Sequence, residues 1–143
     1  GIGSGGSIKL WNDYFPNSMI YSVDIEDRIL CKEIKNMERI KLFIPSNAYD
    51  KNFIKSNFRN KNIIFNIIID DGPHTLESMI NCIELYLELL SDDGILIIED
   101  VKSLEWCEIL KNKIPSELKK NIKIFDLRKN KNRFDDILFT VTK

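Results

Sequence analysis

Residues 63–74 read Ile63-Ile64-Phe65-Asn66-Ile67-Ile68-Ile69-Asp70-Asp71-Gly72-Pro73-His74. The first seven positions are almost entirely apolar, as expected of a strand that is buried on both faces of a parallel sheet. Two carboxylates, a Gly-Pro pair that favours a turn, and the single histidine of the chain follow directly. The stretch therefore predicts a parallel strand whose carboxyl end carries ionisable groups.

Similar apolar runs alternate with amphipathic segments along the rest of the chain. Further strands are predicted at 19–23, 40–44, 95–98, 122–127 and 137–142, and helices at 7–15, 28–36, 50–59, 75–90 and 104–113. This alternation is typical of α/β proteins with a mostly parallel sheet. The last two strands are predicted to form an antiparallel hairpin. Because no repeat, low-complexity tract or linker interrupts the pattern, we expect one domain over residues 1–143.

The composition limits the classes of partner. The chain is 43% hydrophobic and 30% charged, with a formal net charge of −1. Such a charge does not favour general attraction to nucleic acid or to an anionic membrane. The apolar runs are far shorter than the roughly 20 residues of a membrane-spanning helix, and no secretory signal pattern is visible. Three scattered cysteines favour reduced thiols and a cytoplasmic location over a zinc or disulfide framework.

A glycine-rich loop, Gly1-Ile2-Gly3-Ser4-Gly5-Gly6, precedes the first predicted helix, and Asp24 follows the next strand. Glycines let a backbone approach a ligand closely at the turn into a helix. An acidic residue about 20 positions later is placed to hydrogen-bond ribose hydroxyls. The pair favours a nucleotide-type ligand over the alternative, a helix-entry turn with a surface aspartate. The loop lacks the Gly-Lys-Ser/Thr ending of a phosphate-binding loop, which disfavours ATP or GTP.

Acidic residues follow three predicted strands, at Asp24, at Asp70-Asp71 and at Glu99-Asp100. Ligands of open α/β sheets bind at the carboxyl ends of the strands, so these clusters are expected on one rim. Carboxylate oxygens suit a hard divalent cation, and we expect Asp71, Glu99 and Asp100 to hold one Mg²⁺. His74 suits general base catalysis. For each motif alone the alternatives stay open: a solvated strand end, an ordinary turn, or a surface histidine.

The segment 111–133 is rich in lysine and arginine. Contact with RNA or with an anionic substrate is one interpretation. A solvated helix and hairpin face is favoured, because no row of aromatic side chains accompanies the charges. Trp106 is expected to be a packing residue, with a place in the wall of a substrate site as the alternative.

Together these residues resemble the class I S-adenosylmethionine-dependent methyltransferases. The specific part is Asp70-Asp71-Gly72-Pro73-His74 followed by Ile98-Glu99-Asp100. Within the class this pattern is similar to the metal-dependent sugar O-methyltransferases of macrolide biosynthesis, of the mycinamicin type, and to cephalosporin hydroxylase-like proteins. The resemblance implies a Rossmann-like sheet of strand order 3-2-1-4-5-7-6. Its first strand precedes the glycine loop, so it is either missing or supplied by residues outside this sequence. Pro73 departs from the pattern, which more often has a small polar residue there.

The resemblance also implies a role for individual positions. The cofactor S-adenosylmethionine would be bound by Gly1, Gly3, Ser4, Gly5, Asp24, Ser46, Asn47, Ala48 and Asp70, with the glycine loop at the methionine part, Asp24 at the ribose, and residues 46–48 beside the adenine. Mg²⁺, bound by Asp71, Glu99 and Asp100, would chelate two neighbouring hydroxyls of a sugar. His74 would take the proton of the attacking hydroxyl.

We therefore expect an enzyme, a Mg²⁺-dependent O-methyltransferase that acts on a small-molecule or glycan acceptor carrying a sugar or another vicinal diol. Two alternatives differ from it. One is an RNA or catechol-type methyltransferase, although the acidic rim and the near-neutral charge make a nucleic-acid partner unlikely. The other is a non-catalytic scaffold with the same fold, which the costly acidic cluster disfavours. The sequence is also compatible with a homo-oligomer.

Overall fold

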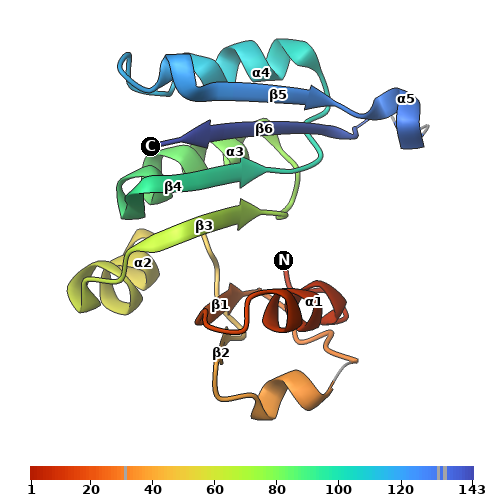
Figure 1. Ribbon diagram of the computed structural model, residues 1–143, viewed down its shortest axis with the longest axis vertical. Helices are drawn as coiled ribbons and strands as arrows, with labels where there is room; N and C mark the ends of the chain where they lie inside the picture. The colour runs from red at the N-terminus through yellow and green to blue at the C-terminus, as the bar shows by residue number, and fades with distance from the viewer. Residues whose placement is uncertain (31, 132, 134) are drawn as a thin grey trace. The chain divides into compact units, whose positions relative to one another are not determined.

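The computed structural model describes residues 1–30, 32–131, 133 and 135–143 (Figure 1). The chain divides into two compact units, Gly1–Phe53 and Ile54–Lys143. Each contains a sheet of its own: β1-β2 in the first unit and β3-β4-β6-β5 in the second. The two units are described separately below.

The first unit contains helix α1 (Gly6–Tyr14), strand β1 (Ile20–Val23), the 3-10 helix η1 (Lys32–Asn36) and strand β2 (Ile40–Phe43); helix α2 (Lys51–Asn57) spans the boundary to the second unit. β1 and β2 are parallel and pair from Ile20 opposite Ile40 to Val23 opposite Phe43. A small core holds the unit together, formed by Ile2, Ile8, Ile29, Ile34 and Ile40. The predicted strands at 19–23 and 40–44 are therefore confirmed.

The helix predicted at 28–36 forms only in part, as the 3-10 helix η1, and residues 28–30 are not helical. The backbone N–H groups before it are used elsewhere. The Leu30 N–H donates to the carbonyl of Ser4 at 3.0 Å, and the Ile29 N–H donates to the Asp27 carboxylate at 3.3 Å. These bonds compete with helical ones and hold the segment against the glycine loop. Cys31, within the predicted helix, lies outside the described residues.

The second unit contains η2 (Arg59–Lys61), β3 (Phe65–Asp70), α3 (Leu76–Tyr86), η3 (Leu87–Leu89), β4 (Leu90–Ile98), α4 (Leu104–Lys111), η4 (Lys119–Asn121), β5 (Ile122–Asp126), α5 (Arg128–Lys131) and β6 (Ile137–Thr142). β3 and β4 are parallel, whereas β6 is antiparallel to both of its neighbours, β4 and β5. The predicted antiparallel hairpin at the end of the chain is confirmed, with the short α5 in its connection (Figure 1).

The core of the second unit lies on the sheet at β4 and β6. Leu96 and Ile98 of β4 and Phe139 of β6 are fully buried, and so are Met79 and Ile83 of α3 to within 2%. Helices α3 and α4 contact each other, so they cover the same face of the sheet. Burial of such side chains contributes about 1.5–3 kcal/mol each, and this rigid sheet supports the loops at its carboxyl edge.

Two details differ from the sequence prediction. Residues 91–94, which lie between the predicted helix at 75–90 and the predicted strand at 95–98, form a bulge within β4, because Phe65 pairs with Leu90 while Ile67 pairs with Ile95. β3 is also not buried on both faces: Ile67 is 41% exposed. β3 is the edge strand of the described four-stranded sheet, so it has a partner strand on one side only.

The order within each sheet agrees with the order that the resemblance implies. β2 and β1 correspond to positions 3-2, and β3-β4-β6-β5 corresponds to 4-5-7-6. The predicted α/β fold, mostly parallel with a C-terminal antiparallel hairpin, is thus confirmed. Among the described residues, no helix combines the length and apolar character that crossing a membrane requires.

Candidate active site

The carboxyl ends of β3 and β4 bring two predicted site residues together. Asp70 pairs with Ile98 at the end of the parallel ladder, and the Glu99 N–H extends it by donating to the Asp70 carbonyl at 3.0 Å. Asp71 and Asp100 each follow one position later. Because adjacent parallel strands end at the same edge of a sheet, these two carboxylates lie on one rim.

His74 is presented by the turn between β3 and α3. Thr75 caps the helix: its hydroxyl accepts from the Ser78 N–H at 3.1 Å, and the Ser78 hydroxyl accepts from the Thr75 N–H at 3.2 Å. This reciprocal capping box fixes the residue that follows His74. His74 itself and Asp100 both have φ of 52°, a left-handed conformation that is uncommon outside glycine. Backbone strain of about 1–3 kcal/mol per residue is found mostly at functional sites.

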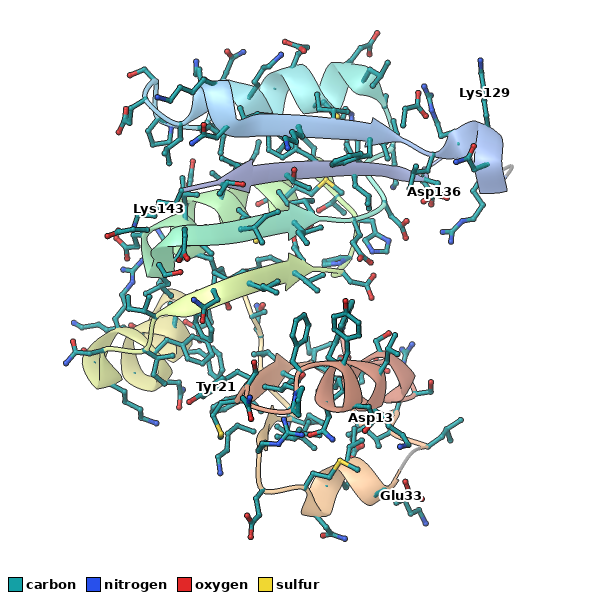
Figure 2. All side chains as sticks on the ribbon, in the orientation of Figure 1. Asp13, Tyr21, Glu33, Lys129, Asp136 and Lys143 are labelled. Carbon is teal, nitrogen blue, oxygen red and sulfur yellow. The ribbon has the colours of Figure 1, made fainter. Side chains whose placement is uncertain are left out.

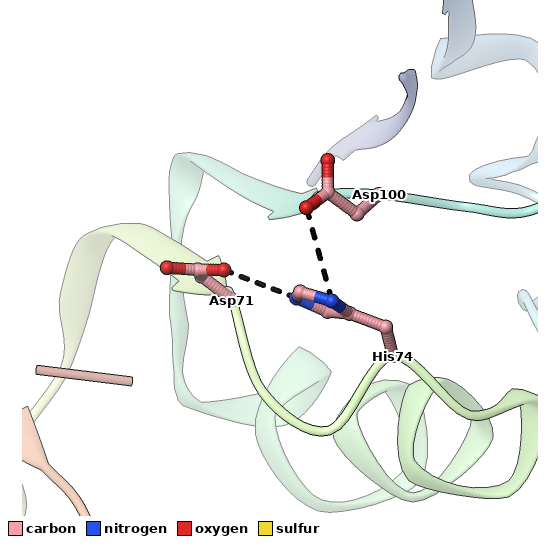
Figure 3. Close-up of side chains that lie close together, drawn as sticks. All are labelled: Asp71, His74 and Asp100. Atoms are coloured by element: carbon pink, nitrogen blue, oxygen red, sulfur yellow. Dashed lines mark hydrogen bonds and ion pairs between the residues drawn. The ribbon is translucent and has the colours of Figure 1, made fainter. Parts of the chain in front are cut away.

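The imidazole of His74 lies between the two carboxylates (Figure 3). Nε2 is 3.1 Å from Asp71 Oδ1, and Nδ1 is 3.8 Å from Asp100 Oδ2. The side chains are 27% exposed for His74, 48% for Asp71 and 18% for Asp100, so the cluster is partly exposed to solvent. One ligand atom from each of the three lies within 4.8 Å of the others, which is a group able to hold a metal ion.

The predicted metal ligands are thus brought together only in part. The group found among the described residues contains Asp71 and Asp100, with His74 in place of Glu99. Both residues follow Ile98, the last residue of β4, and Asp100 has a left-handed φ of 52°, so the chain leaves the extended conformation at Asp100. Metal binding by Glu99 stays a prediction. The sequence predicts His74 as a general base. The position of His74 between two acids shows that its imidazole could also bind a metal ion.

Asp70 has surroundings different from those of Asp71. The pKa of the Cys82 thiol on α3 is raised well above its ordinary value, first by burial and then by the nearby Asp70 carboxylate. Burial, Cys82 and Asp70 also raise the pKa of Tyr86. The Asp70 side chain therefore faces helix α3, while the neighbouring Asp71 faces His74. The predicted contact of Asp70 with the cofactor stays a prediction.

The glycine loop and Asp24 form a second predicted site, in the first unit. Gly3 and Gly5 have φ of 53° and 93°, which glycine adopts at little cost. Asp24, directly after β1, accepts from the Ile2 N–H at 2.6 Å and from the Gly3 N–H at 3.4 Å, both on Oδ2. The structure therefore confirms that the loop and Asp24 are neighbours, as their spacing predicted.

Asp24 is held ionised by backbone groups. Its partial burial favours the neutral acid, but the N–H groups of Glu26, Ile2 and Gly3 outweigh this, so the pKa lies below its ordinary value. The segment after β2 is tied to the same place, because the Ser46 N–H donates to the Asp24 carbonyl at 2.8 Å. The predicted adenine-side residues Ser46, Asn47 and Ala48 thus begin next to the predicted ribose ligand.

One residue at the candidate metal site was not predicted from the sequence. Arg133, treated as part of a solvated basic stretch, has Nη2 3.4 Å from Asp100 Oδ2. The two are 33 residues apart and share no motif, so only the fold relates them. Elsewhere in the stretch, Arg128 forms an ion pair with Asp126. Trp106 is half-buried, with the Lys102 ammonium 5.6 Å above its ring.

Comparisons with known proteins agree with these observations. The sequence is 28% identical, over 72% of its length, to L-olivosyl-oleandolide 3-O-methyltransferase of Streptomyces antibioticus, and it covers 25% of that protein. It is 29% identical, over 71% of its length, to mycinamicin VI 2''-O-methyltransferase of Micromonospora griseorubida, of which it covers 24%. The chain thus spans about a quarter of the length of these curated relatives. No protein-family model matches the sequence.

The fold is also that of a solved methyltransferase. The MycE methyltransferase of the mycinamycin biosynthetic pathway, in complex with Mg, SAH and mycinamycin VI, aligns with a TM-score of 0.67 over 97% of this chain and 40% of that one, at 22% identity. The chain therefore has the fold of the class I methyltransferases, and the predicted resemblance is confirmed. Within that class, its sequence is similar to the O-methyltransferases named above.

Proposed function

We propose that this chain is the S-adenosylmethionine-binding core of a Mg²⁺-dependent O-methyltransferase that acts on a hydroxyl of a sugar or another vicinal diol. The observation that carries the proposal is the convergence of Asp71, His74 and Asp100 at the carboxyl edge of the second sheet. The mycinamicin VI 2''-O-methyltransferase and the Mg- and SAH-bound MycE enzyme support the choice of reaction and cofactors.

The cluster fits a hard divalent cation. Two carboxylates supply oxygen ligands, their ligand atoms lie close enough to share one ion, and their partial exposure lets water or substrate oxygens complete the coordination. Asp71 and Asp100 would hold Mg²⁺, with Glu99 as the third predicted ligand and His74 at its edge. When bound, the cation lowers the pKa of an acceptor hydroxyl.

His74 is placed to accept the proton of the attacking hydroxyl. With Nε2 protonated it donates to Asp71 Oδ1 at 3.1 Å, which leaves Nδ1 as the basic nitrogen. Asp71 orients the ring and stabilises the positive charge that forms on it when a hydroxyl proton arrives. The left-handed turn at His74 and the capping box at Thr75 hold the imidazole in place.

The first unit would bind the cofactor, which supplies an activated methyl group when bound. Gly1, Gly3, Ser4 and Gly5 offer closely approachable backbone, and Asp24 offers an ionised carboxylate for the ribose. We place Ser46, Asn47 and Ala48 beside the adenine and Asp70 at the cofactor's edge. In this proposal both units belong to one methyltransferase domain spanning residues 1–143.

The proposed partner is a small-molecule or glycan acceptor. Pairing of basic side chains with acids, as between Arg128 and Asp126 or Lys113 and Glu84, supports a solvated surface over a nucleic-acid interface. The free, buried thiols of Cys82 and Cys107 support a cytoplasmic location. Assembly into a homo-oligomer is compatible with the proposal.

Calorimetric titration of S-adenosylhomocysteine tests the cofactor site. We expect saturable binding that Asp24→Ala weakens at least about tenfold, since a charged hydrogen bond contributes about 1.5–3 kcal/mol. Asp13→Ala is the matched control, because Asp13 is an exposed acid of the same unit that pairs with Lys9 and accepts a hydrogen bond from Asn12 (Figure 2). Absence of binding in the natural full-length protein, or equal affinity in Asp24→Ala, contradicts the proposed site.

A further inference from the structure

Arg133 reaches the metal cluster from the segment that precedes β6. Its Nη2 is 3.4 Å from Asp100 Oδ2. The same oxygen faces His74 Nδ1 at 3.8 Å and is therefore the oxygen that points into the cluster. A fixed positive charge thus contacts the carboxylate oxygen that a cation in the cluster would use.

Arg133 has a second acidic partner. Its Nε is 3.4 Å from Asp135 Oδ1, and the side chains of Asp135 and Asp100 are 16% and 18% exposed, whereas that of Arg133 is 52% exposed. Both carboxylates, Asp100 first, raise the pKa of Arg133 above its ordinary value, so the guanidinium stays charged. With one nitrogen toward each acid, the guanidinium can leave Asp100 and still be paired with Asp135.

The guanidinium of Arg133 and a divalent metal ion would compete for the same oxygen of Asp100. A guanidinium nitrogen and a divalent ion at one carboxylate oxygen repel each other, and the oxygen's lone pairs are shared between them. Binding of the ion at this oxygen therefore favours a longer or broken Nη2 contact. Asp135 lowers the cost of that step, because it keeps a counter-charge beside Arg133.

We propose that Arg133 is an internal competitor for the divalent cation: it occupies Asp100 when the cluster holds no ion and so weakens the affinity of the site. The inference rests on the proposed metal site at Asp71 and Asp100. Arg133 thereby acts as a positioning residue that sets how much cation is needed to fill the cluster. Cation binding in turn frees the Arg133 Nη2 from its contact with Asp100.

Titration of Mn²⁺, followed by the loss of the free-ion paramagnetic resonance signal, tests this in the natural full-length protein without any turnover. We expect Arg133→Gln to bind Mn²⁺ about fivefold to tenfold more tightly than the unaltered protein. Arg133→Lys, which keeps the charge, should stay within about threefold. The gain in Arg133→Gln should shrink at high salt, because screening removes the repulsion that it relieves.

Two further variants make the outcomes distinct. Arg128→Gln is the matched control: Arg128 belongs to the same segment but pairs with Asp126, so its removal should leave Mn²⁺ affinity unchanged. Asp71→Asn reports on the metal site itself and should abolish binding. Binding that is lost in Asp71→Asn but equal or weaker in Arg133→Gln overturns the competition alone. Failure of every protein to bind Mn²⁺ overturns the metal site and the competition with it.

Discussion

Replacement of Asp100 by asparagine removes one negative charge from the candidate metal cluster with little change in shape. Asp100 has φ of 52°, and asparagine is among the few residues that tolerate this conformation. The contact between Asp71 and His74 does not involve Asp100, and Arg133 retains Asp135. The variant should therefore fold normally, with a thermal transition close to that of the unaltered protein.

The loss in cation affinity follows from the charge. A divalent ion about 2.1 Å from a carboxylate oxygen gains about 4 kcal/mol even at the dielectric constant of water. The amide oxygen or a water molecule restores part of this, which leaves a loss of about 2–3 kcal/mol. This corresponds to about 30- to 150-fold weaker binding.

The assay is a Mn²⁺ or Mg²⁺ titration of Asp100→Asn beside Asp126→Asn. Asp126 also ends a strand of the second sheet, but it pairs with Arg128 and lies outside the metal-binding group. We expect Asp126→Asn to bind like the unaltered protein. Affinity of Asp100→Asn within about threefold of the unaltered protein, with a normal thermal transition, refutes the reasoning that Asp100 is a ligand.

Three further predictions concern other parts of the chain. Arg128 holds the pKa of the Asp126 carboxyl at about 2. The stabilisation from this pair is therefore complete above about pH 4 and lost as the pH falls through 2. Carbon-detected NMR titration should find this value, and Arg128→Gln should return the pKa toward its ordinary range. Gly94→Ala should destabilise the protein by about 1–3 kcal/mol, because a Cβ there meets the Phe65 carbonyl oxygen at 3.0 Å; chemical denaturation measures this, and equal stability contradicts the packing described. His74→Asn should keep cofactor affinity but lower methyl transfer about 10²–10⁴-fold; intact turnover excludes His74 as the base.

The strands of the second unit were predictable because each is marked by its own local pattern of side chains. The apolar runs at 67–69 and 95–98 are short and rich in isoleucine, which favours strands, and the acids after each run mark the strand ends. The same pattern predicted that Asp71 and Asp100 lie on one rim, since neighbouring parallel strands end together. Propensity and periodicity are local, and here the local signals agreed with the final fold.

Other features depended on contacts that no local pattern encodes. The segment before η1 is not helical because the Leu30 N–H bonds to Ser4, 26 positions earlier in the chain. Arg133 was assigned to a solvated face because its contact with Asp100 exists only once β4 and β6 pair. The left-handed conformation of His74 was likewise not predictable, because the Gly72-Pro73 pair indicates a turn but not the φ of the residue that follows it.

Transfer of labelled methyl from S-adenosylmethionine tests the central claim most directly. The natural full-length protein is incubated with a panel of glycosides that carry vicinal hydroxyls, first with Mg²⁺, then with a chelator, and then with Mg²⁺ restored. The account predicts O-methylated product with Mg²⁺, loss of product with the chelator, recovery on restoration, and no product from Asp71→Asn. Product formation that is unaffected by the chelator and by Asp71→Asn contradicts a metal-dependent reaction at this cluster.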